Sequence, residues 1–194
     1  MQRLFLEVGR NSNFWYNLVV KKSILITGVS GVGKTSLSQK LNEMGHKSYD
    51  IDDEQGLFRM IHKETGLPIK DHDNTNLEKV KVMSWICDKE KLASIIENEK
   101  SDLAFYCGNG SNIYQIMDLF KGVILLDVSL ETIKNRLSTR VDNDYARTPD
   151  VQEYVLGKKD KWENEMKNKG AIIVDANGDL NSVAKEVIET AMRF

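Results

Sequence analysis

The residues with the clearest chemical meaning lie together near the start of the chain, in the stretch GVSGVGKT. This stretch fits the pattern G-x-x-x-x-G-K-[ST], in which glycines let the backbone turn tightly and aim its N–H groups at a phosphate. Lys34 can neutralise the β- and γ-phosphates, and the Thr35 hydroxyl can ligate Mg²⁺. An apolar run precedes the stretch and a helical pattern follows it, as the motif requires. We predict a nucleoside triphosphate site built from Gly28, Ser30, Gly31, Val32, Gly33, Lys34, Thr35 and Ser36.

A second candidate group is the acidic run YDIDDE, residues 49–54. Asp50 and Asp52 are two residues apart, so on an extended chain their side chains face the same side. One of them could hold Mg²⁺ or its water, and the other could accept a proton from an acceptor hydroxyl. We take Asp50 as the metal ligand with Thr35, and Asp52 as the base that meets the acceptor, although the spacing alone leaves the two roles exchangeable. The alternative is a solvated acidic turn in which Asp53 caps the next helix.

A glycine-containing turn follows the third apolar run, in the stretch CGNGSN. Gly108 and Gly110 allow a ligand to approach the backbone closely, and Asn109 or Ser111 can hydrogen-bond to it. A plain turn before a helix explains the same residues equally well. We include the turn among the candidate substrate-binding residues.

Three arginines form the last candidate group. Arg136 and Arg140 are four residues apart and share one helical face, and Arg147 follows a polar loop. Cations on such a loop could close over the phosphates, exclude water and stabilise charge on a transferred group. The alternative is a surface helix whose arginines pair with Asp142 and Asp144.

The elements that must position these residues follow a regular alternation from residue 23 onward. Apolar runs predict strands at 23–28, 46–52, 102–108, 122–128 and 170–176. Helical patterns cover about 34–45, 54–66, 77–100, 130–140, 150–168 and 180–193. Strict alternation predicts an α/β fold, a doubly wound five-stranded parallel sheet with helices on both faces and ligands at the carboxyl ends of the strands. We expect one domain over residues 23–194, preceded by an N-terminal extension over residues 1–22.

The composition limits the classes of partner. The 194 residues carry a formal net charge of -2 with basic and acidic residues interspersed, which gives no electrostatic reason to expect nucleic acid or an anionic membrane. The two cysteines fit a reduced, cytoplasmic protein, and no apolar stretch reaches the roughly 18 residues of a membrane span. The sequence leaves the oligomeric state open.

Two nucleotide-binding classes lose support from missing motifs. A switch GTPase should carry an N-K-x-D guanine reader, which this chain lacks. A motor ATPase should have an apolar strand that ends in Asp-Glu, whereas here Asp127 is followed by Val128. A hydrolytic or regulatory ATPase of another kind stays open.

With these motifs together, the chain resembles the P-loop small-molecule kinases of the adenylate kinase and shikimate kinase group. The resemblance covers roughly residues 23–193 and rests on GVSGVGKT, the D-x-D of residues 50–52, the glycine turn, LLDVSLETIKNRLSTR and IIVDANGDLNSVAKEVI. It implies a sheet of order 2-3-1-4-5, a lid at about 138–152 and a separate acceptor region at about 54–80. It also implies an ATP site with Arg136 or Arg140 against the adenine or phosphates, and Ala176 and Asn177 near the base.

Two departures concern the acceptor. The shikimate-type enzymes of the group read the acceptor carboxylate with arginines after the second strand, whereas Arg59 is the only arginine between Arg10 and Arg136. We include Arg59 among the candidate substrate-binding residues. Their three-glycine turn appears here with Asn109 in its middle. We therefore predict an ATP- and Mg²⁺-dependent phosphotransferase that acts on a small molecule, either a nucleoside or nucleotide or a shikimate-like hydroxyl. The alternative is a nucleotide-binding regulatory ATPase without an acceptor.

Overall fold

Five parallel strands form the centre of the computed structural model, which describes residues 21–141 and 143–194. The strands are β1 (Lys22–Thr27), β2 (Lys47–Asp50), β5 (Leu103–Cys107), β6 (Gly122–Asp127) and β7 (Ile172–Asp175). Their order is β2-β5-β1-β6-β7, which is 2-3-1-4-5 when these five are counted along the chain. The predicted fold class and strand order are therefore confirmed. The predicted extension, residues 1–22, lies outside the described residues except for its last two, and Lys22 already belongs to β1.

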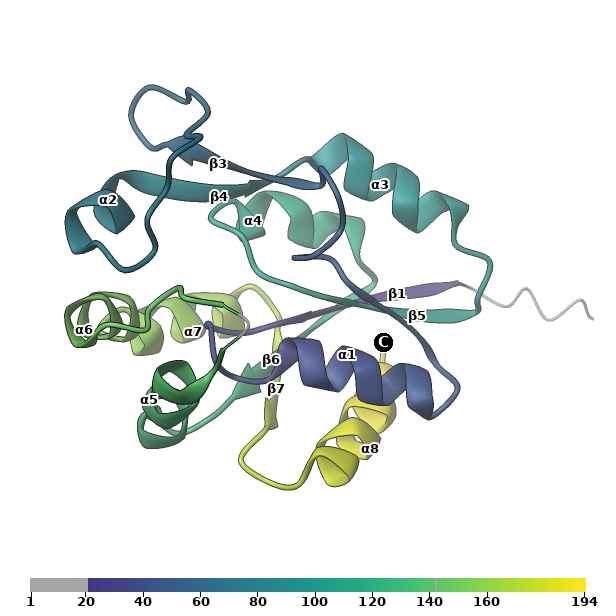
Figure 1. Cartoon of the computed structure of the whole chain (residues 1–194). Helices are drawn as coiled ribbons and strands as arrows, with labels where there is room; N and C mark the ends of the chain where they lie inside the picture. Colours follow the sequence, from purple (N-terminus) through teal and green to yellow (C-terminus); the bar gives the residue numbers. More distant parts are fainter. Residues whose placement is uncertain (1–20, 142) are drawn as a thin grey trace, which may run out of the picture.

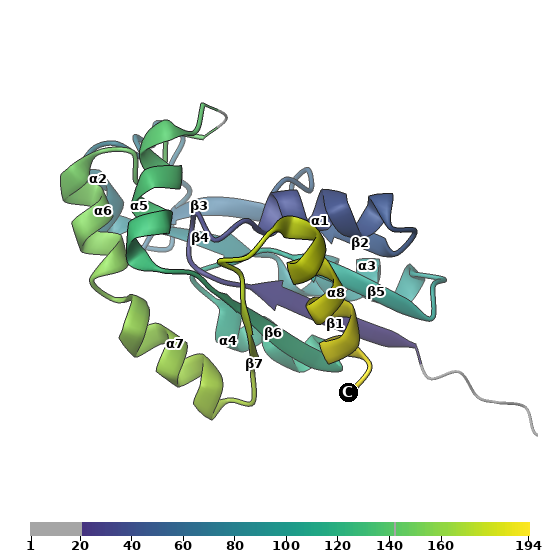
Figure 2. The same cartoon turned by 90° about the horizontal axis from the view of Figure 1, so that it is seen from below.

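Helices cover both faces of the sheet, as Figures 1 and 2 show. They are α1 (Lys34–Glu43), α3 (Lys89–Asn98), α4 (Ile113–Ile116), α5 (Leu130–Thr139), α7 (Lys159–Asn168) and α8 (Leu180–Ala191), whereas α6 (Pro149–Leu156) lies beyond the carboxyl ends of the strands. Successive side chains of β1 point to opposite faces of the sheet and are buried on both, as expected for a central parallel strand. Ile24 and Ile26 belong to the buried cluster that includes α1 and α8, and Leu25 belongs to the cluster that includes α3, α4 and α7.

A hairpin outside the main sheet corrects two predicted helices. Strands β3 (Phe58–His62) and β4 (Met83–Cys87) pair antiparallel, with Met60 opposite Trp85. The pattern at 54–66 predicted a helix, but the segment forms β3, because pairing with a distant partner decides the backbone of a short apolar run. The long helix predicted at 77–100 is three elements: α2 (Leu77–Val82), β4 and α3.

The reason for the second error lies in the sequence of the segment. Its apolar residues are spaced like one face of a single helix, yet in the structure they belong to α2, β4 and α3. The MSWIC run of β4 has the composition of a strand. Asp88 then starts α3 as an N-cap, since its side chain accepts a hydrogen bond from the backbone N–H of Lys91 at 3.0 Å. The helix predicted at 150–168 is likewise divided, into α6 and α7 on either side of Gly157.

Two polar residues after β5 attach the hairpin to the sheet. The Asn112 side chain both accepts from the Cys87 N–H and donates to the Cys87 carbonyl, each at 2.9 Å. The Ser111 N–H donates to the Trp85 carbonyl at 2.7 Å, and the Trp85 N–H donates to the Ser111 hydroxyl at 3.1 Å. The side chains of Phe58 and Trp85 stack with centroids 5.3 Å apart. The hairpin therefore projects from the same edge of the sheet as the turn at 108–110. Within the described residues no helix is long and apolar enough to cross a bilayer.

Candidate active site at the carboxyl ends of the strands

The P-loop, the stretch GVSGVGKT of residues 28–35, connects β1 to α1, and its conformation requires glycine at several positions. Gly31 and Gly33 have φ values of +91° and +106°, in the left-handed region where a side chain is strained. A Cβ atom on Gly28 would lie 2.7 Å from Val32 Cγ2 and 3.0 Å from the Leu126 carbonyl oxygen. The glycines of the motif are therefore explained by the fold itself, and they leave the loop tightly wound around the end of β1.

Lys34 lies inside this loop. The residue is buried, and its Nζ donates to the carbonyl oxygens of Gly28 at 3.0 Å and Val29 at 3.5 Å. Thr35 and Ser36 follow in the first turn of α1 and are exposed. The ammonium group, the positive end of α1 and the Thr35 hydroxyl therefore face one small region, the arrangement that a triphosphate with its cation needs.

Asp50 ends β2 and lies next to this region. Burial raises the pKa of its carboxyl, and the nearby Thr35 hydroxyl and Lys34 ammonium partly oppose the shift. Both carboxylate oxygens are buried, and neither makes a well-formed hydrogen bond with a described residue. Two buried carboxylate oxygens beside a hydroxyl suit a hard cation that takes oxygen ligands, so the residues present fit Mg²⁺.

Asp52 has different surroundings. Burial raises the pKa of its carboxyl from 3.8 to about 6, while the Lys34 ammonium and a hydrogen bond from the Asn109 N–H act in the opposite direction. That hydrogen bond reaches Oδ1 at 3.1 Å. A Cβ atom on Gly108 would lie 2.4 Å from Ile51 Cγ1 and 3.0 Å from Asp52 Oδ1. The glycine turn thus makes room for the acidic loop.

The turn itself continues toward the hairpin. The Asn109 side-chain oxygen is buried without a hydrogen bond to a described residue. A Cβ atom on Gly110 would lie 3.0 Å from Phe58 Cε1 and 3.2 Å from the Trp85 carbonyl oxygen. The turn predicted from the sequence therefore sits between the acidic loop and the hairpin, and both flanking contacts explain why it contains glycine.

Two of the three predicted arginines contact the P-loop. Arg136 Nη1 donates to the carbonyl oxygens of Gly31 at 3.3 Å and Val32 at 3.0 Å. Arg140 Nη1 donates to the Ser30 hydroxyl at 3.2 Å, and its Nη2 donates to the Tyr145 carbonyl. Of the two aspartates in the alternative of surface ion pairs, Asp142 lies outside the described residues, and Asp144 accepts a hydrogen bond from Asn74 Nδ2 at 2.9 Å.

Arg147 binds the loop that follows α5 rather than the P-loop. Its Nη2 donates to the Arg140 carbonyl at 3.0 Å and to the Asn143 carbonyl at 3.3 Å. Ala146, just before it, has a φ of +58°, which is strained for a residue with a side chain. Arg147 thus supports the loop that carries Arg140.

The predicted base-binding residues follow β7. The Ala176 N–H donates to the Asp127 carbonyl at 2.8 Å, which ties this loop to the end of β6. The Asn177 side chain accepts from the Ser129 N–H at 3.0 Å and donates to Asp175 Oδ1 at 2.6 Å. They lie at the same edge of the sheet as the P-loop, which follows β1 next to β6.

Arg59 stands apart from this group. It is an exposed residue of β3, between Phe58 and Met60, so its side chain projects from the other face of the hairpin. Its part in acceptor binding stays a prediction. Sequence reasoning missed the hairpin residues that border the turn, of which Trp85 is the largest; the polar pair Ser111 and Asn112 directly after the glycines was the available signal.

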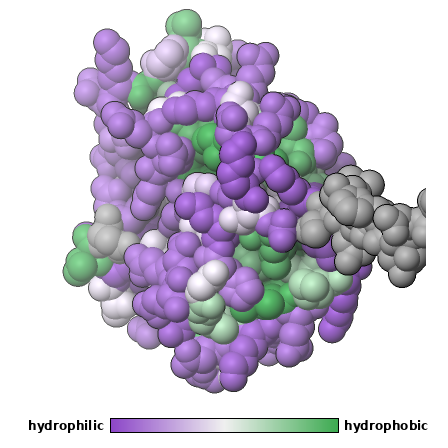
Figure 3. Space-filling model, turned by 90° about the vertical axis from the view of Figure 1, so that its right-hand side faces the viewer, coloured by the Kyte–Doolittle hydropathy of each residue, from purple (hydrophilic) through white to green (hydrophobic). Residues whose placement is uncertain are grey.

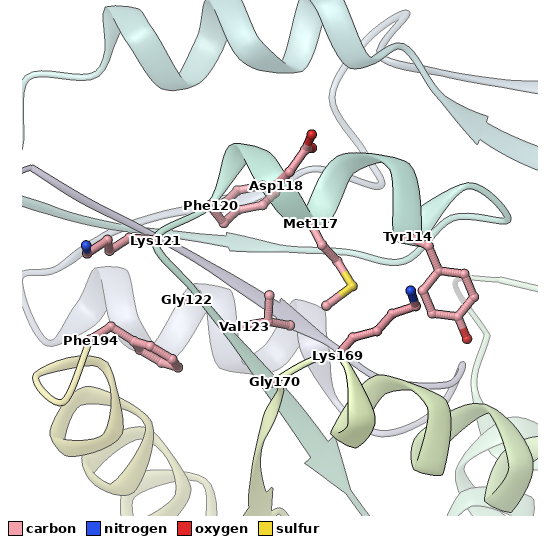
Figure 4. Close-up of a pocket in the computed structure, with 10 residues that line it drawn as sticks. All are labelled: Tyr114, Met117, Asp118, Phe120, Lys121, Gly122, Val123, Lys169, Gly170 and Phe194. Carbon is pink, nitrogen blue, oxygen red and sulfur yellow. The ribbon is translucent and has the colours of Figure 1, made fainter.

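A surface pocket of about 410 Å³ lies elsewhere, where β6 begins (Figure 4). Gly122, Val123, Lys169 and Phe194 are among the residues that line it, and none of the predicted site residues does. Figure 3 views the molecule from the side at which β1 begins, and the surface there is mostly hydrophilic with apolar areas between. Ligands of open α/β sheets bind at the carboxyl ends of the strands, so this pocket is not the candidate active site.

Solved structures with this fold include several small-molecule kinases. A shikimate kinase from Acinetobacter baumannii in complex with shikimate has a TM-score of 0.56 at 16% identity, over 89% of this chain and 94% of the other. A deoxyadenosine kinase from M. mycoides gives 0.55 at 15%, over 89% and 100%. A gluconokinase from Sinorhizobium meliloti 1021 gives 0.51 at 16%, over 89% and 92%. The expected resemblance to P-loop small-molecule kinases is therefore confirmed at the level of the fold.

Sequence comparison identifies the family. No curated protein matches the chain. The family profile described as AAA domain matches residues 24–157, a segment that runs from β1 to the end of α6. It contains the P-loop, both acidic residues, the glycine turn and the three arginines. Because this match covers more than half of the chain, the chain belongs to the AAA domain family.

Proposed function

We propose that the chain is an ATP- and Mg²⁺-dependent phosphotransferase that moves the γ-phosphoryl group to a small-molecule acceptor. The observation that carries the proposal is the Asp52 carboxyl, which has a pKa of about 6 and lies beside the P-loop lysine. A base whose pKa is near the working pH is well suited to accept a proton from a hydroxyl in the transition state. The names of the structural neighbours, a shikimate kinase, a deoxyadenosine kinase and a gluconokinase, support the same reaction class.

The donor half of the reaction uses the P-loop. Lys34 and the loop N–H groups hold the triphosphate, and Arg136, Ala176 and Asn177 border the nucleotide. Thr35 and Asp50 would hold Mg²⁺, which neutralises charge on the β- and γ-phosphates when bound. These groups lower the barrier through position and electrostatics, since phosphoryl transfer leaves the protein little covalent chemistry to perform.

The acceptor half uses Asp52 and the lid arginine. Asp52 accepts the proton of the acceptor hydroxyl as the bond from its oxygen to the γ-phosphorus forms and the bond to the β-phosphate oxygen breaks, leaving ADP. Arg140, held by Arg147, stabilises charge on the transferred group. The acceptor lies against the turn at 108–110 and the region of residues 54–80. We propose a nucleoside, a nucleotide or a shikimate-like hydroxyl compound as the acceptor class.

A phosphoryl-transfer screen tests the proposal. ATP, Mg²⁺ and the protein are incubated with nucleosides, nucleotides, shikimate and sugar acids, and both ADP and phosphorylated product are measured. We expect one class of acceptor compound to stimulate ADP release and to be recovered in phosphorylated form. Asp52→Asn should abolish this stimulation, whereas Asp53→Asn, at an exposed neighbouring position, should keep it. Slow ATP hydrolysis that no acceptor stimulates would support the alternative, a nucleotide-binding regulatory ATPase.

A further inference from the structure

Two hydrogen bonds join the predicted acceptor region, residues 54–80, to the predicted lid, residues 138–152. Asn74 Nδ2 donates to Asp144 Oδ1 at 2.9 Å, and Thr148 Oγ1 donates to the Thr75 carbonyl oxygen at 3.1 Å. Each bond connects residues that are at least 70 positions apart in the chain. The loop before α2 and the loop before α6 are therefore in direct contact.

The loop before α2 is built to present these groups. Asp73 Oδ1 accepts from both the Thr75 N–H at 3.0 Å and the Thr75 hydroxyl at 2.7 Å. Asn76 caps α2 by accepting from the Lys79 N–H at 3.2 Å. Because both flanks of the Thr75 carbonyl are fixed locally, little conformational entropy is lost when the carbonyl meets Thr148.

Apolar packing reinforces the two hydrogen bonds. Val80 of α2 and Met83 of β4 belong to the same buried cluster as Val151 of α6. Met60 of the hairpin and Tyr145 of the lid pack against that cluster. Figures 1 and 2 show α2 and α6 as neighbours in both views. The hairpin with α2, and the lid with α6, therefore share one continuous contact.

The other end of the lid reaches the P-loop. The Arg147 N–H donates to the Asp144 carbonyl at 3.1 Å, which fixes the turn that carries Asp144. Asn143 Oδ1 accepts from the Tyr145 N–H at 2.8 Å, and Arg140 binds both the Tyr145 carbonyl and the Ser30 hydroxyl. A path of direct contacts thus runs from Asn74 through the lid turn to Ser30.

We propose that Asn74, Thr75, Asp144 and Thr148 form a latch that positions Arg140 on the P-loop, so that the acceptor region and the nucleotide site stabilise each other. The hydrogen bonds of the latch are present in the chain without ligands. The coupling of an acceptor site to a nucleotide site rests on the proposed function. Coupling between sites is reciprocal, so a nucleotide that orders the lid also orders the loop before α2. Asn74 is a positioning residue in this reading, since it acts on Arg140 through Asp144.

Amide hydrogen exchange tests the latch directly. Exchange in α2 and α6 is measured for the full chain, with and without Mg²⁺ and a non-hydrolysable ATP analogue. We expect Asn74→Ala and Asp144→Ala each to accelerate exchange in both helices by about three- to tenfold, the weight of one partly exposed hydrogen bond. Asp144→Asn keeps an oxygen that accepts from Asn74 and should behave as wild type, as should Asn98→Ala, whose amide bonds within its own helix.

The double variant separates a latch from two local effects. If the Asn74 and Asp144 side chains act through each other, Asn74→Ala/Asp144→Ala exchanges no faster than either single variant. Acceleration confined to the helix nearest the substitution, or additive acceleration in the double variant, overturns the latch. With an acceptor from the screen, the latch variants should also form less phosphorylated product per ADP released, by about three- to tenfold. A screen that finds no acceptor defeats the proposed function alone, because the exchange result stands without it.

Discussion

Replacing Asp52 by asparagine should make the protein more stable and less active at once. Burial raises the pKa of this carboxyl from 3.8 to about 6, so the folded state disfavours the charged form. The resulting loss of stability is nearly absent below the unfolded pKa, grows as the pH rises from about 4 to about 6, and is complete above the folded pKa. A shift of about two units corresponds to at most about 3 kcal/mol.

Part of that energy is screened, because the carboxyl is not fully enclosed. We therefore expect Asp52→Asn to raise the free energy of unfolding at pH 7.5 by about 1 to 2 kcal/mol. The asparagine oxygen still accepts from the Asn109 N–H, so no buried donor is left unpaired. At pH 4.0, where the folded carboxyl is already protonated, most of the gain should disappear. Catalysis of acceptor phosphorylation should fall by about 10²-fold or more, because the base is lost.

The measurement is urea denaturation of the wild type and the variant at both pH values, with turnover measured in parallel. Asp53→Asn is the matched control: it removes the same charge at an exposed position and should change the unfolding free energy by less than about 0.5 kcal/mol. A variant that is less stable than the wild type at pH 7.5, or equally stabilised at both pH values, would refute the assignment of a buried, perturbed carboxyl.

Three further substitutions probe the same site. Lys34→Ala should lower turnover by about 10²-fold or more with a small change in the urea midpoint, since the side chain serves the phosphates; wild-type turnover would contradict this. Gly108→Ala should destabilise the chain by about 1 to 3 kcal/mol in urea denaturation, because the added methyl group would lie 2.4 Å from Ile51 Cγ1; an unchanged midpoint would show that the turn can relax. Arg140→Lys should lower kcat about tenfold or more while the affinity for a fluorescent ATP analogue changes little, since an ammonium cannot keep the guanidinium's contact with Ser30 and the lid together; a loss of affinity alone would place Arg140 with the ground-state nucleotide.

The parts of the site that could be predicted are those in which local sequence dictates local structure. The P-loop is one continuous turn, in which Gly31 and Gly33 have positive φ values that favour glycine whatever lies around them. Arg136 and Arg140 were found because they are four positions apart, about one helical turn, and both reach the P-loop. The strand order followed from the resemblance to P-loop kinases, whereas the five buried runs alternating with helices predicted the parallel sheet.

The hairpin could not be predicted in this way. Its two strands are separated by 20 residues of chain, and their apolar residues fit a helical stripe as well as a strand when read alone. The decision is made by partners elsewhere: Asn112 binds both backbone groups of Cys87, and Ser111 does the same for Trp85. Periodicity does not reveal contacts of this kind, so the region nearest the proposed acceptor site was the least predictable part of the fold.

The two aspartates show why spacing alone left their roles exchangeable. Alternation along a strand would give Asp50 and Asp52 the same environment, but β2 ends at Asp50 and the backbone turns immediately after it. Asp50 is left facing Thr35, with carboxylate oxygens that make no well-formed hydrogen bond to the described part of the chain, which favours the role of a metal ligand. Asp52 turns toward the Asn109 N–H and acquires a pKa of about 6, which favours the role of a base. The end of a four-residue strand, rather than the D-x-D pattern, separates the two functions.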